Sequence, residues 1–196
     1  LVDGFDHRNL NIILTGTVYK ECTPRLLVRA IQLLPINLQN KVKLHYYGAY
    51  IDLVESEFIT GGIPNCIVNH GIVKKNEAIA AVKKADILLS LVFDSIDKNI
   101  TSAIYGLMTT KIFDYFLSGK PIVNIGPSDM DVNKLAADIG YNNFYSFNSK
   151  QEVALSNYLG EACNNLHQHR QRISNVILPD FSLVFERILN DIQDHV

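Results

Sequence analysis

Four polar residues near the middle of the chain, Thr109, Thr110, Lys111 and Asp114, have the types and the spacing of a site for a phosphorylated sugar compound. A lysine ammonium and the free backbone N–H groups of a helix start attract phosphate. A carboxylate one turn further along can accept a hydrogen bond from a sugar hydroxyl. The threonine hydroxyls stand where they can cap unpaired N–H groups. A solvated lysine and aspartate on an ordinary surface helix is the competing interpretation.

A short helix followed at once by a strand must position these residues. Apolar side chains recur at one-, three- and four-residue steps, which predicts a helix with one buried stripe: Ile112, Phe113, Phe116 and Leu117. Gly119 stands where this helix should stop, and Pro121 prevents its continuation. Residues 121–125 are expected to form the strand.

The rest of the chain alternates in the same way between short apolar runs and helical patterns. Strands are predicted at 11–15, 41–47, 65–69, 85–93, 121–125 and 143–147, and helices at 24–34, 52–58, 75–84, 109–118, 134–139 and within 149–174. Strands without polar alternation are typical of a sheet buried on both faces. The fold class is therefore α/β, a doubly wound, Rossmann-like parallel sheet of about six strands with helices on both faces.

In such a sheet the carboxyl ends of all strands lie on one edge. In the strand order 3-2-1-4-5-6, the first and fourth strands are neighbours and a crevice opens between their ends. The glycine turn at 15–17 and the helix start at Thr109 should face each other there, with His70 and Gly71 nearby.

Composition narrows the function classes. The chain of 196 residues has a net charge of −2, which gives no electrostatic reason to expect nucleic acid as a partner. Its cysteines are three and widely spaced, so a reducing, cytoplasmic compartment fits better than a disulfide framework or a metal site. No apolar run approaches the ~18 residues of a membrane span. Walker, dinucleotide-binding and nucleophile-elbow motifs are also missing from the sequence.

Four stretches together resemble a known family. They are Val2 to Asp6, Leu14 to Tyr19, Asn69 to Val73 with the later run Ala85 to Leu89, and Lys111 to Val123. In this order and spacing they are similar to the C-terminal, donor-binding domain of a group 1, retaining glycosyltransferase, one half of a GT-B fold. The start at Leu1 adds to the expectation that the chain is part of a longer protein. The expected organisation is a linker remnant at 1–10, the nucleotide-sugar-binding domain at 11–178 and an amphipathic helix at 179–196 that packs on it.

The resemblance implies a role for each matching residue. Lys111, with the amides of Thr109 and Thr110, would hold the donor diphosphate and is the candidate stabiliser of the leaving group. Asp114 would bind the ribose hydroxyls. Gly16 would approach the diphosphate from the turn after the first strand.

Further residues complete the implied site. Thr17 adjoins the glycine turn, and Lys20 is an additional candidate phosphate ligand, with a solvated loop residue as its alternative. The segment formed by Gly71, Ile72 and Val73 would contact the nucleobase. His70 could touch the donor or be an ordinary loop histidine.

The resemblance also implies a reaction. A hexosyl group would pass from a nucleotide diphosphate sugar to a glycan or a lipid-linked sugar held by a missing N-terminal domain, in polysaccharide biosynthesis, without a cofactor or metal. This chain alone would turn over little. The parent protein could associate peripherally with the inner face of a membrane.

Two departures from the family pattern keep other functions open. Gly106 stands where many members have a sugar-binding glutamate, and Thr17 stands where many have an arginine. A catalytically inactive scaffold module and half of a GT-B-like sugar-nucleotide epimerase are the alternatives. Outside these motifs, we expect His45 to be packed and His167 and His169 to lie on the surface.

Overall fold

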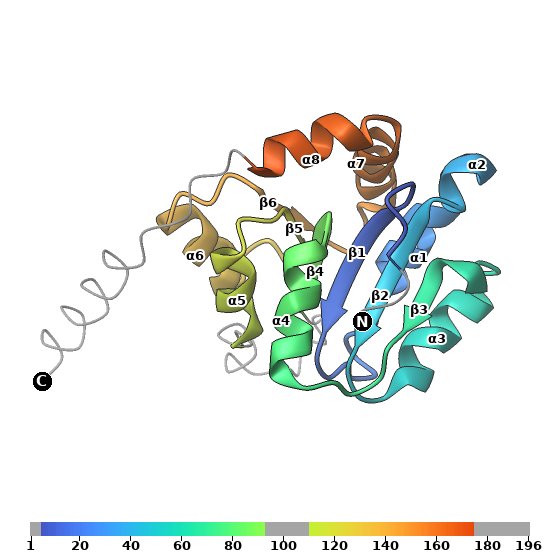
Figure 1. Cartoon of the computed structure of the whole chain (residues 1–196), viewed down its shortest axis with the longest axis horizontal. Coiled ribbons are helices and arrows are strands. Elements are labelled where there is room, and N and C mark those ends of the chain that lie inside the picture. The colour runs from blue at the N-terminus through green and yellow to red at the C-terminus, as the bar shows by residue number, and fades with distance from the viewer. Residues whose placement is uncertain (1–4, 93–109, 175–196) are drawn as a thin grey trace, which may run out of the picture.

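The computed structural model describes residues 5–92 and 110–174 (Figure 1). Several predictions fall partly or wholly outside these ranges. They concern the linker remnant up to residue 4, the end of the strand at 85–93, Gly106, the helix start at Thr109, the end of the domain at 175–178 and the amphipathic helix at 179–196. Within the described residues the chain forms one parallel sheet with helices on both faces.

The sheet has six strands in the order β3-β2-β1-β4-β5-β6, all parallel. The strands are β1 (Leu10–Thr15), β2 (Val42–Tyr47), β3 (Ile67–Asn69), β4 (Ile87–Leu91), β5 (Ile122–Ile125) and β6 (Phe144–Phe147). This confirms the predicted fold class and the predicted strand order. Strands β2 and β3 are added on one side of β1, and strands β4 to β6 are added on the other side. The carboxyl ends of β1 and β4 therefore form the switch point of the sheet.

Two separate cores show why the strands read as unbroken apolar runs. In β1, Leu10, Ile12 and Leu14 pack in one core, whereas Ile13 packs in the other. Neighbouring residues of a strand point to opposite faces. A strand with helices on both sides therefore needs apolar residues at consecutive positions.

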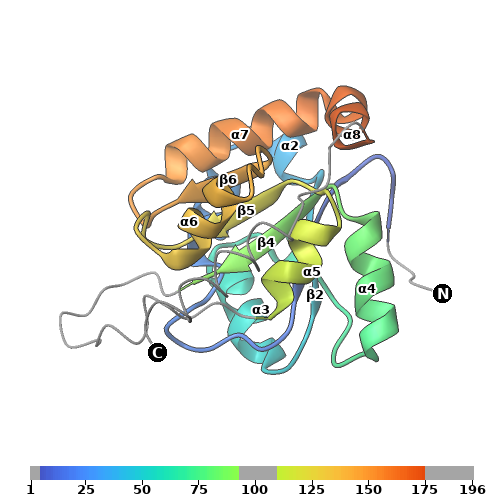
Figure 2. The ribbon, with the colours of Figure 1, turned by 90° about the vertical axis from the view of Figure 1, so that its left-hand side faces the viewer.

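The helices divide between these two faces. Helices α1 (Arg25–Gln32), α3 (Ile51–Thr60) and α7 (Glu152–Asn164) contribute to the first core, and α4 (Lys75–Lys84), α5 (Lys111–Leu117) and α6 (Asp131–Asp138) to the second. Figure 2 looks onto the face that α4 and α5 cover. Helix α2 (Ile36–Gln39) is a single turn after α1, and α8 (Leu166–Ser174) follows α7 directly. None of the helices in the two described ranges is long and apolar enough to cross a bilayer.

Local boundaries differ from the prediction in three places. Helix α6 begins at Asp131 rather than residue 134, residues 64–66 form a 3₁₀ turn before β3, and α2 was not predicted. Each concerns a segment of four residues or fewer, where periodicity carries too few positions to define a period.

Helix α8 lies across the amino ends of the strands, opposite to the arrowheads of β1 and β2 (Figure 1). Its Arg170 contacts residues that immediately precede β1 and β4. Helix α8 thus covers the amino ends of the strands, and the predicted site lies at their carboxyl ends. We call these two sides of the sheet the amino edge and the carboxyl edge.

Candidate functional site

A cavity of about 560 Å³ opens at the carboxyl edge, where the ends of β1 and β2 meet α4 and the start of α5. It is lined by Thr15, Gly16, Thr17, Tyr47, Gly48, Ala49, Ile72, Val73, Lys75, Ala78, Ile79, Val82, Thr110, Lys111, Asp114 and Tyr115. We call it the carboxyl-edge cleft. It brings together seven of the predicted site residues, from three separate parts of the chain.

Lys111 and Gly16 are in direct contact in this cleft. The Lys111 Nζ occupies the position that a Cβ at residue 16 would take, and Gly16 has a φ of +93°, which favours glycine. Lys111 is half-buried and forms no hydrogen bond or ion pair with a described residue, and burial lowers the pKa of its ammonium group. The cleft therefore contains a partly desolvated cation held over a backbone turn.

Two tyrosines fix the position of this pair. The backbone N–H of Thr15 donates to the Tyr115 hydroxyl over 3.0 Å, which ties α5 to the end of β1. On the other side, the Tyr46 hydroxyl lies 2.7 Å from the carbonyl oxygen of Gly16 and also contacts that of Ala49. Both tyrosines are buried, and burial raises the pKa of Tyr46 to about 12. Neither was predicted to serve the site, although a buried tyrosine normally has a hydroxyl partner.

Asp114 lines the cleft with an exposed side chain, one turn along α5 from Lys111. Thr110 is the residue that precedes α5, but its hydroxyl makes no capping hydrogen bond. The capping role predicted for it is therefore wrong, whereas its place in the cleft agrees with the prediction. Thr109 lies outside the described residues.

The other predicted residues divide into two groups. Thr17, Ile72 and Val73 line the cleft, and the Ile72 side chain is 81% exposed. Gly71 precedes them in a left-handed turn with a φ of +70° but does not itself line the cavity. Lys20 is exposed and lines a separate hollow that includes Tyr19 and Tyr50, so the structure does not bring it to Lys111.

Tyr47 and Gly48 line the cleft although the sequence analysis did not assign them. The Tyr47 hydroxyl is buried and has no hydrogen-bond partner among the described residues. A Cβ at Gly48 would overlap the carbonyl oxygen of Gly16, so only glycine allows these two turns to approach. The signal for Gly48 was its place directly after a buried strand.

Solved structures share the fold of this chain, whereas no family model and no curated protein matches it. The chain is 14% identical to WaaG, a glycosyltransferase involved in lipopolysaccharide biosynthesis, with a TM-score of 0.60 over 87% of this chain and 42% of that one. It is 13% identical to the pneumococcal O-GlcNAc transferase GtfA, with a TM-score of 0.54 over 95% and 36%. It is 12% identical to TarM of S. aureus, with a TM-score of 0.55 over 93% of this chain and 35% of that one.

The chain has the fold of one half of a GT-B glycosyltransferase. At such low identities the likeness concerns the fold. The chain spans less than half of the length of each of these enzymes.

An ion pair between the buried Asp86 and the partly exposed Arg170 holds α8 at the amino edge of this GT-B half. Asp86 precedes β4, and its carboxylate accepts hydrogen bonds from Arg170 Nε over 2.7 Å and from Arg170 Nη2 over 2.9 Å. Arg170 also donates to the carbonyl oxygens of His7 and Asn9. The Asp86 side chain is 5% exposed, and its hydrogen bonds raise the pKa of Arg170. Arg170 thereby joins α8 to the segments before β1 and β4.

A chain of polar side chains leads from this ion pair towards the cleft. Asn11 donates its backbone N–H to Asp86 over 2.9 Å, and its Oδ1 lies 3.1 Å from His45 Nε2. His45 Nδ1 lies 3.0 Å from His70 Nε2. His70 does not line the cleft itself; its ring stacks on Tyr47, with the ring centroids 4.2 Å apart. The predicted packed state of His45 agrees with its complete burial.

His169 corrects one prediction. Its side chain is half-buried and its Nε2 lies 3.1 Å from the backbone oxygen of Asp86, whereas we expected it on the surface. His167, two residues earlier, is exposed as expected. Because the two residues point to different sides of α8, only one of them meets the sheet. The described residues contain no group of three or more histidines, cysteines or carboxylates that could hold a metal ion.

We expect the stability of this GT-B half to fall between pH 6.5 and pH 4. Burial, with the nearby charge of His70 as a second cause, lowers the pKa of His45 to about 4, from 6.5 in the unfolded chain. The unfolded state then binds more protons in this window, so the contribution of His45 is complete above pH 6.5 and is lost as the pH falls towards 4. Its size is about 3 kcal/mol. The free energy of unfolding, measured by urea denaturation at half-unit pH steps, gives this contribution.

The steepness with which the free energy of unfolding falls between pH 6.5 and pH 4, rather than its absolute value, tests whether His45 causes this loss. His45→Gln should flatten the acid limb of the curve, whereas removal of the exposed His167 should leave it steep. An equally steep limb in His45→Gln would show that other groups cause the acid sensitivity.

Proposed function

We propose that this chain is the donor-binding half of a glycosyltransferase and that it binds a nucleotide diphosphate sugar in the carboxyl-edge cleft. The observation that carries the proposal is the Lys111 ammonium lying over the Gly16 turn, in the same cavity as Asp114. A partly desolvated cation that pairs with none of the described residues and lies beside a glycine turn suits a diphosphate. A carboxylate one turn away suits the adjoining ribose.

The remaining lining fits the other parts of such a ligand. Ile72 and Val73 offer an apolar surface for a planar base, and α4 closes that side with Ala78 and Ile79. The buried, unpaired Tyr47 hydroxyl supplies a further hydrogen-bonding group. GtfA was solved with UDP and GlcNAc, which supports the same class of ligand for a domain of this fold.

The chemistry that this site supports is departure of the diphosphate. As the bond between the sugar C1 and the diphosphate oxygen breaks, negative charge grows on that oxygen. The acceptor oxygen forms the new bond to C1, and its proton passes to the departing diphosphate. A cation already in place lowers the barrier because it needs no reorganisation. We assign this role to Lys111 and propose that the reaction needs no metal ion.

The acceptor would bind to the other half of a GT-B enzyme. We therefore propose that this chain binds the donor alone and turns it over only within the longer protein, with a hexose as the transferred group and a glycan or a lipid-linked sugar as the acceptor. The three cysteines, all buried, fit a reducing, cytoplasmic compartment.

Replacing Asp114 by alanine should weaken nucleotide binding selectively at the ribose. A hydrogen bond to a charged group contributes about 1.5–3 kcal/mol, so the Kd for the preferred nucleoside diphosphate should rise about 10- to 150-fold. Calorimetry with uridine, guanosine, adenosine and thymidine diphosphates identifies that nucleotide. The 2′-deoxy form should bind the unchanged chain as weakly as the ribose form binds Asp114→Ala.

The deoxy comparison also provides the control. Asp114→Ala should no longer distinguish the ribose from the deoxyribose form, whereas Asp129→Ala, at an exposed position away from the cleft, should keep the full distinction. No binding at millimolar nucleotide, or binding indifferent to Asp114, would contradict the proposal. Donor hydrolysis or transfer by the longer protein distinguishes an enzyme from an inactive scaffold module.

A further inference from the structure

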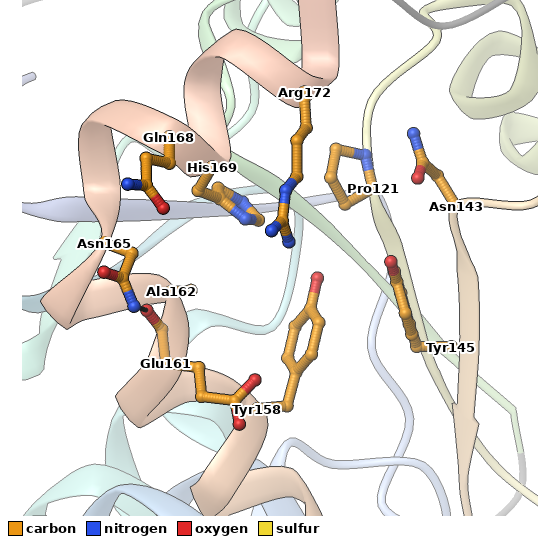
Figure 3. A pocket seen from close by; sticks show the side chains of 10 residues that line it. All are labelled: Pro121, Asn143, Tyr145, Tyr158, Glu161, Ala162, Asn165, Gln168, His169 and Arg172. Carbon is orange, nitrogen blue, oxygen red and sulfur yellow. Dashed lines mark hydrogen bonds between the residues drawn. The ribbon is translucent and has the colours of Figure 1, made fainter.

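A second cavity lies at the opposite edge of the sheet, where α7 and α8 meet the amino ends of β5 and β6 (Figure 3). Its volume is about 160 Å³, and it is lined by Pro121, Asn143, Tyr145, Tyr158, Glu161, Ala162, Asn165, Gln168, His169 and Arg172. We call it the α7/α8 cavity. It shares no residue with the carboxyl-edge cleft.

The lining points several unused polar groups into one space. The Tyr158 hydroxyl is buried and has no hydrogen-bond partner among the described residues, and burial raises its pKa. In Figure 3 this hydroxyl, the Tyr145 hydroxyl and the Arg172 guanidinium converge on the open centre of the cavity. Arg172 forms no ion pair with a residue of the described ranges. A buried hydroxyl without a partner is costly, so a ligand that moves the neighbouring side chains aside and pairs with it gains a hydrogen bond that the described residues do not supply.

The charges around the cavity favour a neutral ligand. Arg172 and Glu161 both stand at its exposed rim, one positive and one negative. An anion would be repelled by Glu161 and a cation by Arg172. A hydroxyl, in contrast, can donate to the carboxylate and accept from the guanidinium at once. Asn143, Asn165 and Gln168 add side-chain amides, which also both donate and accept.

The shape favours a compact ring. The floor consists of Pro121 and Ala162, both buried, and of the packed rings of Tyr145 and Tyr158, whose centroids are 4.6 Å apart. The volume is many times the roughly 10–15 Å³ that a single water needs. A rigid ring with hydroxyls around its edge can meet the polar rim while one face lies on this apolar floor.

We propose that the α7/α8 cavity is a second binding site, for a neutral sugar ring, separate from the carboxyl-edge cleft. Tyr158 and Arg172 anchor the sugar hydroxyls, and Glu161 accepts from one of them. The site lies between α8 and the start of β6. A bound sugar therefore also bridges the last two described helices and the edge strand of the sheet.

Chemical-shift mapping of the ¹⁵N-labelled chain, titrated with glucose in saturating uridine diphosphate, tests this proposal. We expect saturating shifts in residues 143–145 and 158–172, with a Kd of about 1–10 mM. Tyr158→Phe should raise that Kd at least about fivefold. This variant removes only a hydroxyl without a partner, so it is expected to fold normally. Arg172→Ala should have a similar effect, whereas Arg29→Ala, at an exposed position on α1, should have none.

Two further titrations test the ligand class. Sorbitol carries the same hydroxyls on an open chain and should bind at least about tenfold more weakly, because its shape is not fixed in advance. Sodium acetate should cause no saturating shift. The proposal is overturned if glucose does not saturate these shifts by about 100 mM, which would leave only water in the cavity. Sorbitol or acetate binding as well as glucose, or a Tyr158→Phe variant with unchanged affinity, would also overturn it. Shifts confined to residues 15–17 and 110–115 would place the sugar in the cleft instead.

Discussion

Replacing Lys111 by alanine is expected to weaken nucleoside diphosphate binding about 10- to 150-fold, which corresponds to the roughly 1.5–3 kcal/mol of a charge-assisted hydrogen bond. The effect should be at the upper end of that range because Lys111 is half-buried and forms no hydrogen bond with a described residue. Within the described ranges no carboxylate forms an ion pair with it, and its charge is only partly solvated. Calorimetric titration of the variant with the preferred diphosphate gives the ratio of the two Kd values.

Two control titrations test whether the loss of affinity comes from the contact between Lys111 and the diphosphate. The free nucleoside, which carries no phosphate, should bind equally to the Lys111→Ala variant and to the unchanged chain. Lys20→Ala removes an equal charge from an exposed position outside the cleft and should change the Kd by less than about twofold, since solvent and salt screen that charge. A loss below threefold for Lys111→Ala, or equal losses for both lysines, would remove the basis of the proposed function.

Replacing Asp86 by alanine should have the largest effect on folding, a loss of about 2–4 kcal/mol from the free energy of unfolding. The substitution leaves the Arg170 guanidinium without its counter-ion and the backbone N–H of Asn11 without an acceptor. The Arg170 side chain is 30% exposed, so water offsets part of its loss, whereas the Asn11 N–H is buried and finds no other acceptor among the described residues. The midpoint of urea unfolding should fall while the slope of the transition stays the same.

An exposed ion pair of similar chemistry provides the control. Asp131 pairs with Lys134 on the surface of α6 over 3.2 Å, so Asp131→Ala should cost no more than about 0.5 kcal/mol. Asp86→Asn, which keeps the shape but not the charge, should lie between the two. If Asp86→Ala cost less than 1 kcal/mol, Arg170 would not be what holds α8 against the sheet.

The sequence alone determined the architecture of this protein. Apolar runs such as 11–15 and 121–125 can be recognised as strands without knowledge of the neighbouring strands, because a strand covered on both faces must be apolar at consecutive positions. The alternation of strands and helices then restricts the connections to right-handed crossovers. Together these two facts place all carboxyl ends on one edge, and the strand order common in this fold class then brings the Gly16 turn close to the helix that carries Lys111.

Tertiary structure decided which side chains share a cavity and which merely lie near it. Lys20 is four residues from Gly16 yet faces a different hollow, and His70 turns its ring onto Tyr47 beside the cleft. The hydrogen bonds by which Tyr46 and Tyr115 fix the end of β1 could not be predicted from the sequence either, since Tyr115 and Thr15 lie 100 positions apart in the chain. Periodicity reports that a residue is buried but not what it contacts.

The amino edge shows the same division most clearly. A surface position was predicted for His169 because its segment is polar and helical, and no local pattern indicates that Arg170 pairs with a carboxylate 84 positions earlier. The α7/α8 cavity likewise depends on the angle at which α8 crosses the sheet. Local sequence determines which segments form helices and strands, because propensity and burial act over a few residues. Contacts between distant side chains exist only once those elements have packed.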